Sequence, residues 1–253
     1  MRIVSFNIHK GIGGRDRRYR LERIIEALRT LEPDAICLQE VDHHVARSRF
    51  DHQARLISDA LGLVHSHYQL NVRLKEGGYG NLVASRYPLA SVHAISLTRR
   101  HYKPRGAQLV VVQTPLGRLH LIHWHLGLRE TERHWQVRRM FEHQHFREHR
   151  QLPAIAIGDT NDWRNTLASG PFAVHGWKQI SSPPSRFRSF PAWLPLGALD
   201  KVFVNSGVVI QSCHIARSRL LRDASDHLPL VVDLSGFHEQ PADHLPRLSL
   251  PVP

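Results

Sequence analysis

The sequence predicts an α/β protein in which two β-sheets pack face to face and helices cover them outside. Short apolar segments typical of strands recur along nearly the whole chain, and they are more numerous than one sheet holds easily. Helical periodicity appears in only a few places. The length of 253 residues suits one sizeable domain and is too short for two comfortable ones.

The first quarter of the chain alternates strand and helix patterns. Residues 1–6 have a strand pattern, and residues 34–41 form a continuous apolar run typical of a strand covered on both faces. Between them, residues 19–31 carry apolar side chains at helical spacing, and Pro33 stops this helix. A second helix is predicted over residues 52–61.

Strand patterns dominate the rest of the chain. They cover residues 81–86, 90–97, 106–113, 118–125, 154–158, 187–190, 199–204, 208–215 and 228–234. Residues 130–149 carry a thin apolar stripe and predict one long helix. Residues 236–253 are rich in proline and lack periodicity. We therefore expect one catalytic domain over residues 1–235, followed by a tail that is poorly ordered or draped on the surface.

The formal net charge of +12 favours a polyanionic partner, either nucleic acid or an anionic lipid surface, although solubility alone is the simpler explanation. No apolar run approaches the roughly 18 residues of a membrane span, and the N-terminus carries no secretory signal pattern. Cys37 and Cys213 lie far apart and predict no disulfide framework. These features predict a protein of the reducing cytoplasm.

Polar side chains recur at the ends of the predicted strands. They are Asn7, Glu40, His125, Asp159, Asn161, Asp200, Asp226 and His227. If these strand ends converge, one cleft holds the carboxylates, amides and imidazoles that metal-assisted hydrolysis needs. Each residue alone has a plainer explanation; residues 158–162, for example, form a sequence that also suits a turn capping a helix. Their joint order and spacing carry the prediction.

Oxygen ligands of this kind favour Mg²⁺ or Mn²⁺. Zinc is the competing hypothesis, because His123 and His125 alternate on a strand and so share a face. However, no third ligand lies at zinc-site spacing.

Eight segments in order make the chain resemble the endonuclease/exonuclease/phosphatase superfamily. This superfamily includes pancreatic-type deoxyribonuclease, apurinic endonucleases, neutral sphingomyelinases and inositol phosphatases. The segments are SFNI at 5–8, LQEV at 38–41, GNLVASRYP at 80–88, RGA at 105–107, HWHL at 123–126, GDTND at 158–162, LDKVFV at 199–204 and SDHLPL at 225–230. The resemblance is greatest to small bacterial members. It implies a four-layer α/β sandwich with two mostly antiparallel sheets and the active site at one edge.

The resemblance also implies roles for the strand-end residues. Glu40 is the main Mg²⁺ or Mn²⁺ ligand, Asn7 lies beside it, and Asp226 ligates or orients the ion. Asp159 positions or deprotonates the attacking water, and Asn161 holds the phosphate or the nucleophile.

Other residues bind the phosphate in this resemblance. His227 stabilises or protonates phosphate oxygens with Asp200 as its partner, and His125 is a second phosphate-binding histidine. Further contacts to substrate are expected from Arg105, Asn81 and His9.

The predicted function is a metal-dependent phosphodiesterase that acts on nucleic acid or phospholipid by in-line attack of water. Two departures argue against apurinic-site repair: His9 stands where apurinic endonucleases carry an acid, and His125 where they use a tyrosine. Thr160 replaces the family's usual aromatic in a loop-supporting position. The aromatic and basic stretch 186–193 suits either nucleic-acid stacking or a core strand. The alternatives are a monoesterase acting on a small phosphorylated metabolite or lipid headgroup, and a binding module without activity.

Overall fold

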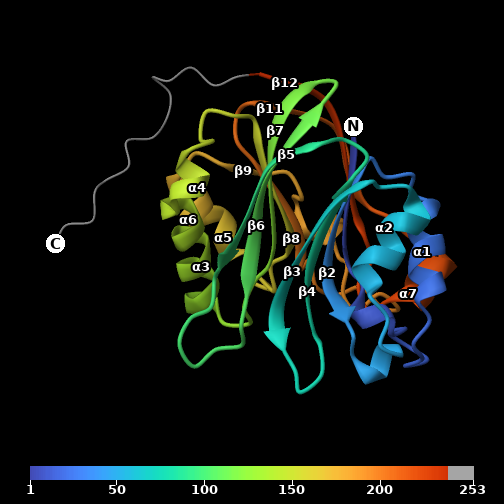
Figure 1. Cartoon of the computed structure of the whole chain (residues 1–253). Coiled ribbons are helices and arrows are strands. Elements are labelled where there is room, and N and C mark those ends of the chain that lie inside the picture. The colour runs from blue at the N-terminus through green and yellow to red at the C-terminus, as the bar shows by residue number, and fades with distance from the viewer. Residues whose placement is uncertain (239–253) are drawn as a thin grey trace.

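The computed structural model describes residues 1–238, which form two six-stranded sheets that face each other (Figure 1). In the first sheet the order is β11 (Val208–Ile215), β12 (Leu230–Phe237), β1 (Arg2–Asn7), β2 (Ala35–His43), β4 (Gly78–Ser85) and β3 (His65–Arg73). In the second it is β5 (Leu89–Ser96), β6 (Gly106–Thr114), β7 (Gly117–His125), β8 (Ala154–Asp159), β10 (Asp200–Val204) and β9 (Lys178–Gln179). The pairs β1–β2 and β7–β8 are parallel, and the other pairs are antiparallel.

Helices lie outside both sheets (Figure 1). The first sheet is flanked by α1 (Leu21–Arg29), α2 (Gln53–Leu61) and α7 (Arg219–Ala224). The second is flanked by α3 (Glu130–Glu142), α4 (Gln144–Arg147), α5 (Thr166–Ser169) and α6 (Pro171–Val174). The predicted four-layer sandwich with mostly antiparallel sheets is confirmed. In residues 1–238, no helix is both long and apolar enough to cross a bilayer.

Two apolar cores hold the layers together. The larger joins the facing sides of the sheets to α1 and α7, with Phe6, Leu38 and Ile157 fully buried in it. The smaller lies between the second sheet and its helices, around Trp124 and Phe172. Alternate residues of β7 and β8 therefore enter different cores, whereas both faces of β1 and β2 belong to the larger core, so all four strands are apolar on both faces.

The two sheets repeat one strand order. In each, a parallel central pair joined by a helix is flanked by antiparallel strands, so β1–β2 corresponds to β7–β8. Parallel strands end at one edge, and their antiparallel neighbours begin there. Register pairs His125 with Asp159 and Asp159 with Asp200, and it pairs Asn7 with Gln39 in the other sheet. The topology thus brings the predicted site residues to one edge.

Several predicted elements differ from the structure. Residues 187–190 form a loop with one bridge between Phe190 and Gly197, because Pro191 lacks the N–H that a continuing strand would donate. The long helix breaks at His143, which is extended (φ −69°, ψ 136°) and whose Nδ1 accepts from the backbone of His145. β3, β9, α5, α6 and α7 were not predicted.

The predicted boundary of the tail also shifts. β12 continues through Phe237, two residues into the segment predicted as tail. The remainder of that prediction, over residues 239–253, lies outside the described residues.

Candidate active site

Asp159 lies at the centre of a polar cluster at the shared edge. Its Oδ2 accepts a hydrogen bond from Asn7 Nδ2 at 3.1 Å, and it lies 3.3 Å from His125 Nε2 and 3.7 Å from His227 Nε2. Its Oδ1 accepts from the backbone N–H of Asn161 at 2.9 Å. Burial raises the pKa of the Asp159 carboxyl, and the charge of His227 opposes that rise. Four other predicted residues therefore contact or approach one buried carboxylate.

His227 is held by a carboxylate from the second sheet. Its Nδ1 donates to Asp200 Oδ2 at 2.8 Å, and the same oxygen accepts from Ser189 Oγ at 2.5 Å. Burial alone would lower the pKa of His227, but the charges of Asp200 and Asp159 outweigh burial and raise it. The ring is therefore an imidazolium, with its Nε2 side facing Asp159.

His125 has the opposite protonation state. Burial lowers its pKa well below the ordinary value, and the neighbouring positive charges of Arg105 and His227 lower it further. The site thus contains one charged and one neutral imidazole. Arg105 adds a cation that is 6% exposed, and its Nε has no hydrogen-bond partner within residues 1–238.

Glu40 reaches this edge through an irregularity in β2. Between Leu38 and Val41 the pairing with β4 shifts register, so that Gln39 and Glu40 lie opposite Asn81 alone. The backbone of Glu40 is also in the left-handed conformation, with a φ of 57°. This conformation costs a residue other than glycine about 1 kcal/mol or more. Such a bulge bends the strand locally and changes the direction of a side chain.

Glu40 is paired with a cation that sequence reasoning did not select. Lys10 Nζ donates a hydrogen bond to Glu40 Oε2. Burial would raise the pKa of Glu40, but Lys10 outweighs burial and lowers it. The carboxylate is therefore ionised and attracts a cation. Lys10 and Lys103 also lie over the ring of Tyr79, at 5.5 and 5.1 Å from its centroid.

His9 connects two predicted metal ligands. Its backbone N–H donates to Asn7 Oδ1 at 3.1 Å, and its Nε2 lies 3.7 Å from Asp226 Oδ2. Ser225 Oγ donates to the carbonyl of Asn7 at 2.7 Å, which ties the loop before β12 to the end of β1.

Carboxylate and amide oxygens at this edge fit a hard divalent ion. Glu40, Asp226 and Asn7 supply them, and Mg²⁺ needs only one or two protein carboxylates because it keeps several waters. Lys10 has to leave Glu40, or share it, for an ion to bind there.

The remaining predicted residues have positioning roles in this conformation. Asn81 Nδ2 donates to the carbonyl of Gly106 at 3.3 Å, joining the two sheets. Asn161 Nδ2 donates to the carbonyl of Leu126 at 3.0 Å, and Thr160 Oγ1 to that of Leu199 at 2.7 Å.

Asp162 fulfils the capping alternative for this segment. Its carboxylate accepts from the backbone N–H groups of Thr166 and Leu167 at 3.2 and 3.0 Å, at the start of α5. It therefore has a structural role.

His123 belongs to a buried hydrogen-bond chain between the sheets. Its Nε2 accepts from Gln39 Nε2 at 2.7 Å, so its Nδ1 donates to Gln108 Oε1 at 2.8 Å. Both nitrogens are therefore occupied, and the pairing of His123 with His125 does not offer zinc two free imidazoles.

Sequence reasoning missed Lys10, Ser189, Ser225 and Tyr79. Ser225 begins one of the quoted motifs and Lys10 lies two residues after another, so their positions were a usable signal. Ser189 and Tyr79 acquire partners only through the fold.

Known proteins resemble this chain over nearly its whole length. The model of the Endonuclease/Exonuclease/phosphatase family matches residues 4–227. The chain belongs to this family. Its members include phosphoesterases, which are hydrolases of phosphate esters that generally use divalent metals.

Individual relatives cover nearly the whole chain. The uncharacterized protein YbhP of Escherichia coli (strain K12) is 29% identical over 247 residues, which is 92% of this chain and 95% of YbhP. A family structure from Beutenbergia cavernae superposes with a TM-score of 0.76 at 21% identity, covering 94% of this chain and 72% of that one. The mannosyl-6-phosphatase Bt3783 of Bacteroides thetaiotaomicron has a TM-score of 0.71 at 16% identity, covering 93% and 99%.

Proposed function

We propose that this family member is a Mg²⁺- or Mn²⁺-dependent phosphodiesterase that hydrolyses a polyanionic substrate by in-line attack of water. The observation that carries the proposal is the placement of Asp159. Its Oδ2 lies within 3.7 Å of Asn7, His125 and His227, each from a different segment. Phosphoryl transfer depends mainly on positioning and charge neutralisation, and this cluster supplies both.

Each residue has a role that follows from its protonation state. Asp159 orients the attacking water and accepts its proton. The imidazolium of His227, fixed by Asp200, donates to a phosphate oxygen whose negative charge grows during the reaction. Arg105 adds a permanent positive charge from a buried position. A divalent ion held by Glu40, with Asn7 and Asp226, would polarise the phosphate.

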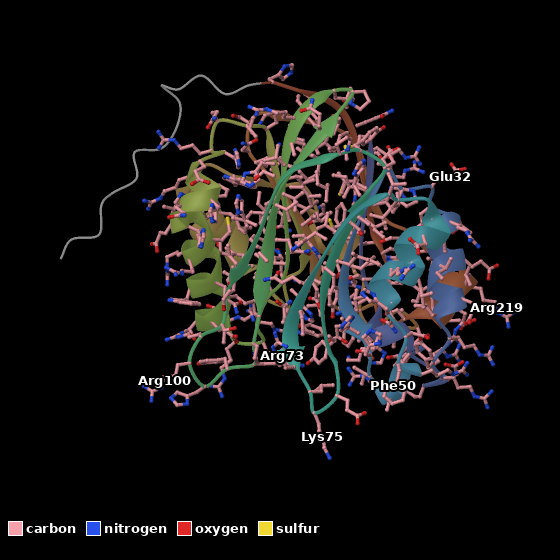
Figure 2. All side chains as sticks on the ribbon, in the orientation of Figure 1. Glu32, Phe50, Arg73, Lys75, Arg100 and Arg219 are labelled. Carbon is pink, nitrogen blue, oxygen red and sulfur yellow. The ribbon has the colours of Figure 1, made fainter. Side chains whose placement is uncertain are left out.

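The loops around the site favour a substrate with several phosphates. Segments 73–77 and 97–105 connect β3 to β4 and β5 to β6, and the topology places both at the site edge. Figure 2 shows Arg73, Lys75 and Arg100 at the same end of the molecule. The two segments contain Arg73, Lys75, Arg99, Arg100, Lys103 and Arg105 against the single acid Glu76.

One hollow beside these loops suits an additional phosphate. It has a volume of about 580 Å³ and is lined by Arg99, Arg100, His101, Tyr102 and Arg129. Such basic surfaces contribute the salt-dependent part of binding to nucleic acid or anionic lipid.

A monoesterase is the second candidate. The similarity to a protein described as a mannosyl-6-phosphatase favours it, although that likeness, at 16% identity, extends to the fold alone.

Turnover of bis-p-nitrophenyl phosphate and p-nitrophenyl phosphate distinguishes the candidates. Purified protein is assayed with Mg²⁺, with Mn²⁺ and with EDTA, and then with plasmid DNA, RNA and anionic phospholipid vesicles. We expect EDTA-sensitive cleavage of the diester to exceed that of the monoester. Cleavage of the monoester alone would support the phosphatase, and absence of metal-dependent turnover on every substrate would contradict the proposal.

A further inference from the structure

A second group of metal-ligating side chains lies where β5 meets α4. His93 of β5, His145 of α4 and Glu148 just after α4 place their ligand atoms within 4.8 Å of one another. Of all the side chains in residues 1–238, only these three form such a group of His, Cys, Asp or Glu. The rings of His93 and His145 are stacked at 3.6 Å, and His145 Nδ1 lies 3.0 Å from Glu148 Oε2.

This group is remote from Asp159. His120 lies beneath α4 and near the start of β7. His125 of the active site is the last residue of that strand. Five residues of an extended strand span roughly 17 Å. In Figure 1, α4 lies towards the upper end of the molecule, and β2 ends towards the lower end.

The surroundings of the group are rich in further imidazoles. His143 lies 5.2 Å from His145 between ring centroids, and His149 lies 5.5 Å from His120. His120 is fully buried, and neither of its ring nitrogens has a hydrogen-bond partner within residues 1–238. An ordinary surface ion pair between His145 and Glu148 does not involve His93, whose ring lies against that of His145.

We propose that His93, His145 and Glu148 bind one Zn²⁺ ion that is independent of the active site. Two imidazoles and a carboxylate match the donors that zinc prefers, whereas Mg²⁺ prefers oxygen. His145 and Glu148 are three residues apart and therefore share one side of a helical turn. The bound ion links the edge strand β5 to α4, and water fills the fourth position.

To bind the ion, the two rings have to rotate out of their stack, because an imidazole nitrogen binds a metal in the plane of its ring and the planes of His93 and His145 are now within 5° of parallel. Donors around tetrahedral zinc lie roughly 3.4 Å apart. The ligand atoms, now within 4.8 Å of one another, also have to approach by about 1 Å. Glu148 is exposed, and His93 and His145 are partly exposed, so this shift meets little resistance.

Zinc titration of the full chain against a chromophoric chelator tests the site. All proteins carry Glu40→Ala, which weakens ion binding at the active site, and 1 mM Mg²⁺ is present. We expect one zinc per chain with a dissociation constant below about 1 μM, and a melting temperature about 5 °C higher at hundredfold excess of zinc over that constant. Adding His93→Ala and His145→Ala removes both effects, whereas adding His214→Ala, an exposed histidine on β11, leaves them unchanged.

Glu148→Gln keeps the test decisive if the double histidine variant does not fold. Glu148 is exposed, so its substitution leaves folding intact, and we expect zinc affinity to fall at least tenfold. Unchanged zinc affinity in Glu148→Gln, or in the folded double variant, would overturn the proposal. The result does not depend on whether the protein hydrolyses a phosphodiester.

Discussion

At the scale of single residues, the candidate site depends on partners that are distant in sequence. Asp159 and Asn7 are separated by 152 positions yet joined by a 3.1 Å hydrogen bond. Asp159, His227 and Asp200 could be selected as candidates from the sequence, because each of them lies within a motif. The motifs did not reveal that Lys10 pairs with Glu40 or that Ser189 holds Asp200, because those contacts arise only from chain folding.

Asp200 should control the orientation and charge of His227. In Asp200→Asn the imidazole loses the carboxylate that favours its protonated form, so we expect kcat to fall about 100-fold or more with little change in KM. Ser189→Ala keeps that carboxylate and should cost less than tenfold. Steady-state kinetics on bis-p-nitrophenyl phosphate measure both. Wild-type kcat in Asp200→Asn would refute the assigned pairing.

Lys10 should compete with the divalent ion for Glu40. Lys10→Met removes the ammonium that contacts this carboxylate, so we expect half-maximal activity at a lower Mg²⁺ concentration. Lys103→Met is the matched control, because Lys103 lies over the same Tyr79 ring but forms no ion pair with Glu40 in the described part of the chain. A Mg²⁺ requirement that rises or stays constant in Lys10→Met would refute the competition.

At the scale of elements, strands with an apolar inner face were predictable, and strands with a polar one were not. β3 was missed because His67 and Gln69 point towards the second sheet, where they bond to Gln108 and to the carbonyl of Ile95. β9 has only two residues and carries no periodicity. Residues 187–190 were wrongly predicted as a strand because alternating aromatics also suit a loop whose Phe187 is buried.

The loop after β8 should be stabilised by the buried ion pair of Lys201 with Asp162, a carboxylate that Arg133 also approaches at 3.5 Å. Lys201 is 1% exposed, its Nζ donates to the carbonyl of Asp162, and burial lowers its pKa to about 8 against the opposing charge of Asp162. Asp162→Ala leaves this cation unpaired and α5 uncapped, so we expect a loss of roughly 3–5 kcal/mol of unfolding free energy.

A double substitution separates pairing from capping in urea unfolding. Asp162→Asn with Lys201→Met removes both charges, and it should be more stable than Asp162→Asn alone. If the two proteins unfold at the same urea concentration, the charge pair has no stabilising role.

At the scale of the whole molecule, buried neutral histidines lie between the layers together with the apolar side chains. The bonds of His123 to Gln39 and Gln108 cross between the sheets, and His120 lies beneath α4. Burial lowers the pKa of each of these two histidines to about 3. The sequence contains 20 histidines, and their number alone does not show which of them are buried.

These two histidines should make the fold sensitive to acid. Below the ordinary histidine pKa of about 6.5, these histidines bind protons in the unfolded chain but remain neutral in the folded chain. The free energy of unfolding therefore falls as the pH decreases. We expect each of the two histidines to lower the free energy of unfolding by about 2 kcal/mol when the pH falls from 7 to 5. His123→Gln should flatten this dependence in urea unfolding, whereas His214→Ala should not. An identical pH dependence in His123→Gln would contradict the assignment.

The most direct test of the proposed chemistry is the Mg²⁺-dependent rate of bis-p-nitrophenyl phosphate hydrolysis by Asp159→Asn. Asp59→Asn, at an exposed position on α2, serves as the matched control. We predict that Asp159→Asn folds normally, as judged by circular dichroism, but loses at least a thousandfold in kcat, because the amide cannot accept the proton of the attacking water. Asp59→Asn should retain wild-type activity. A folded Asp159→Asn protein with near-wild-type turnover would contradict the proposed role of Asp159 in catalysis.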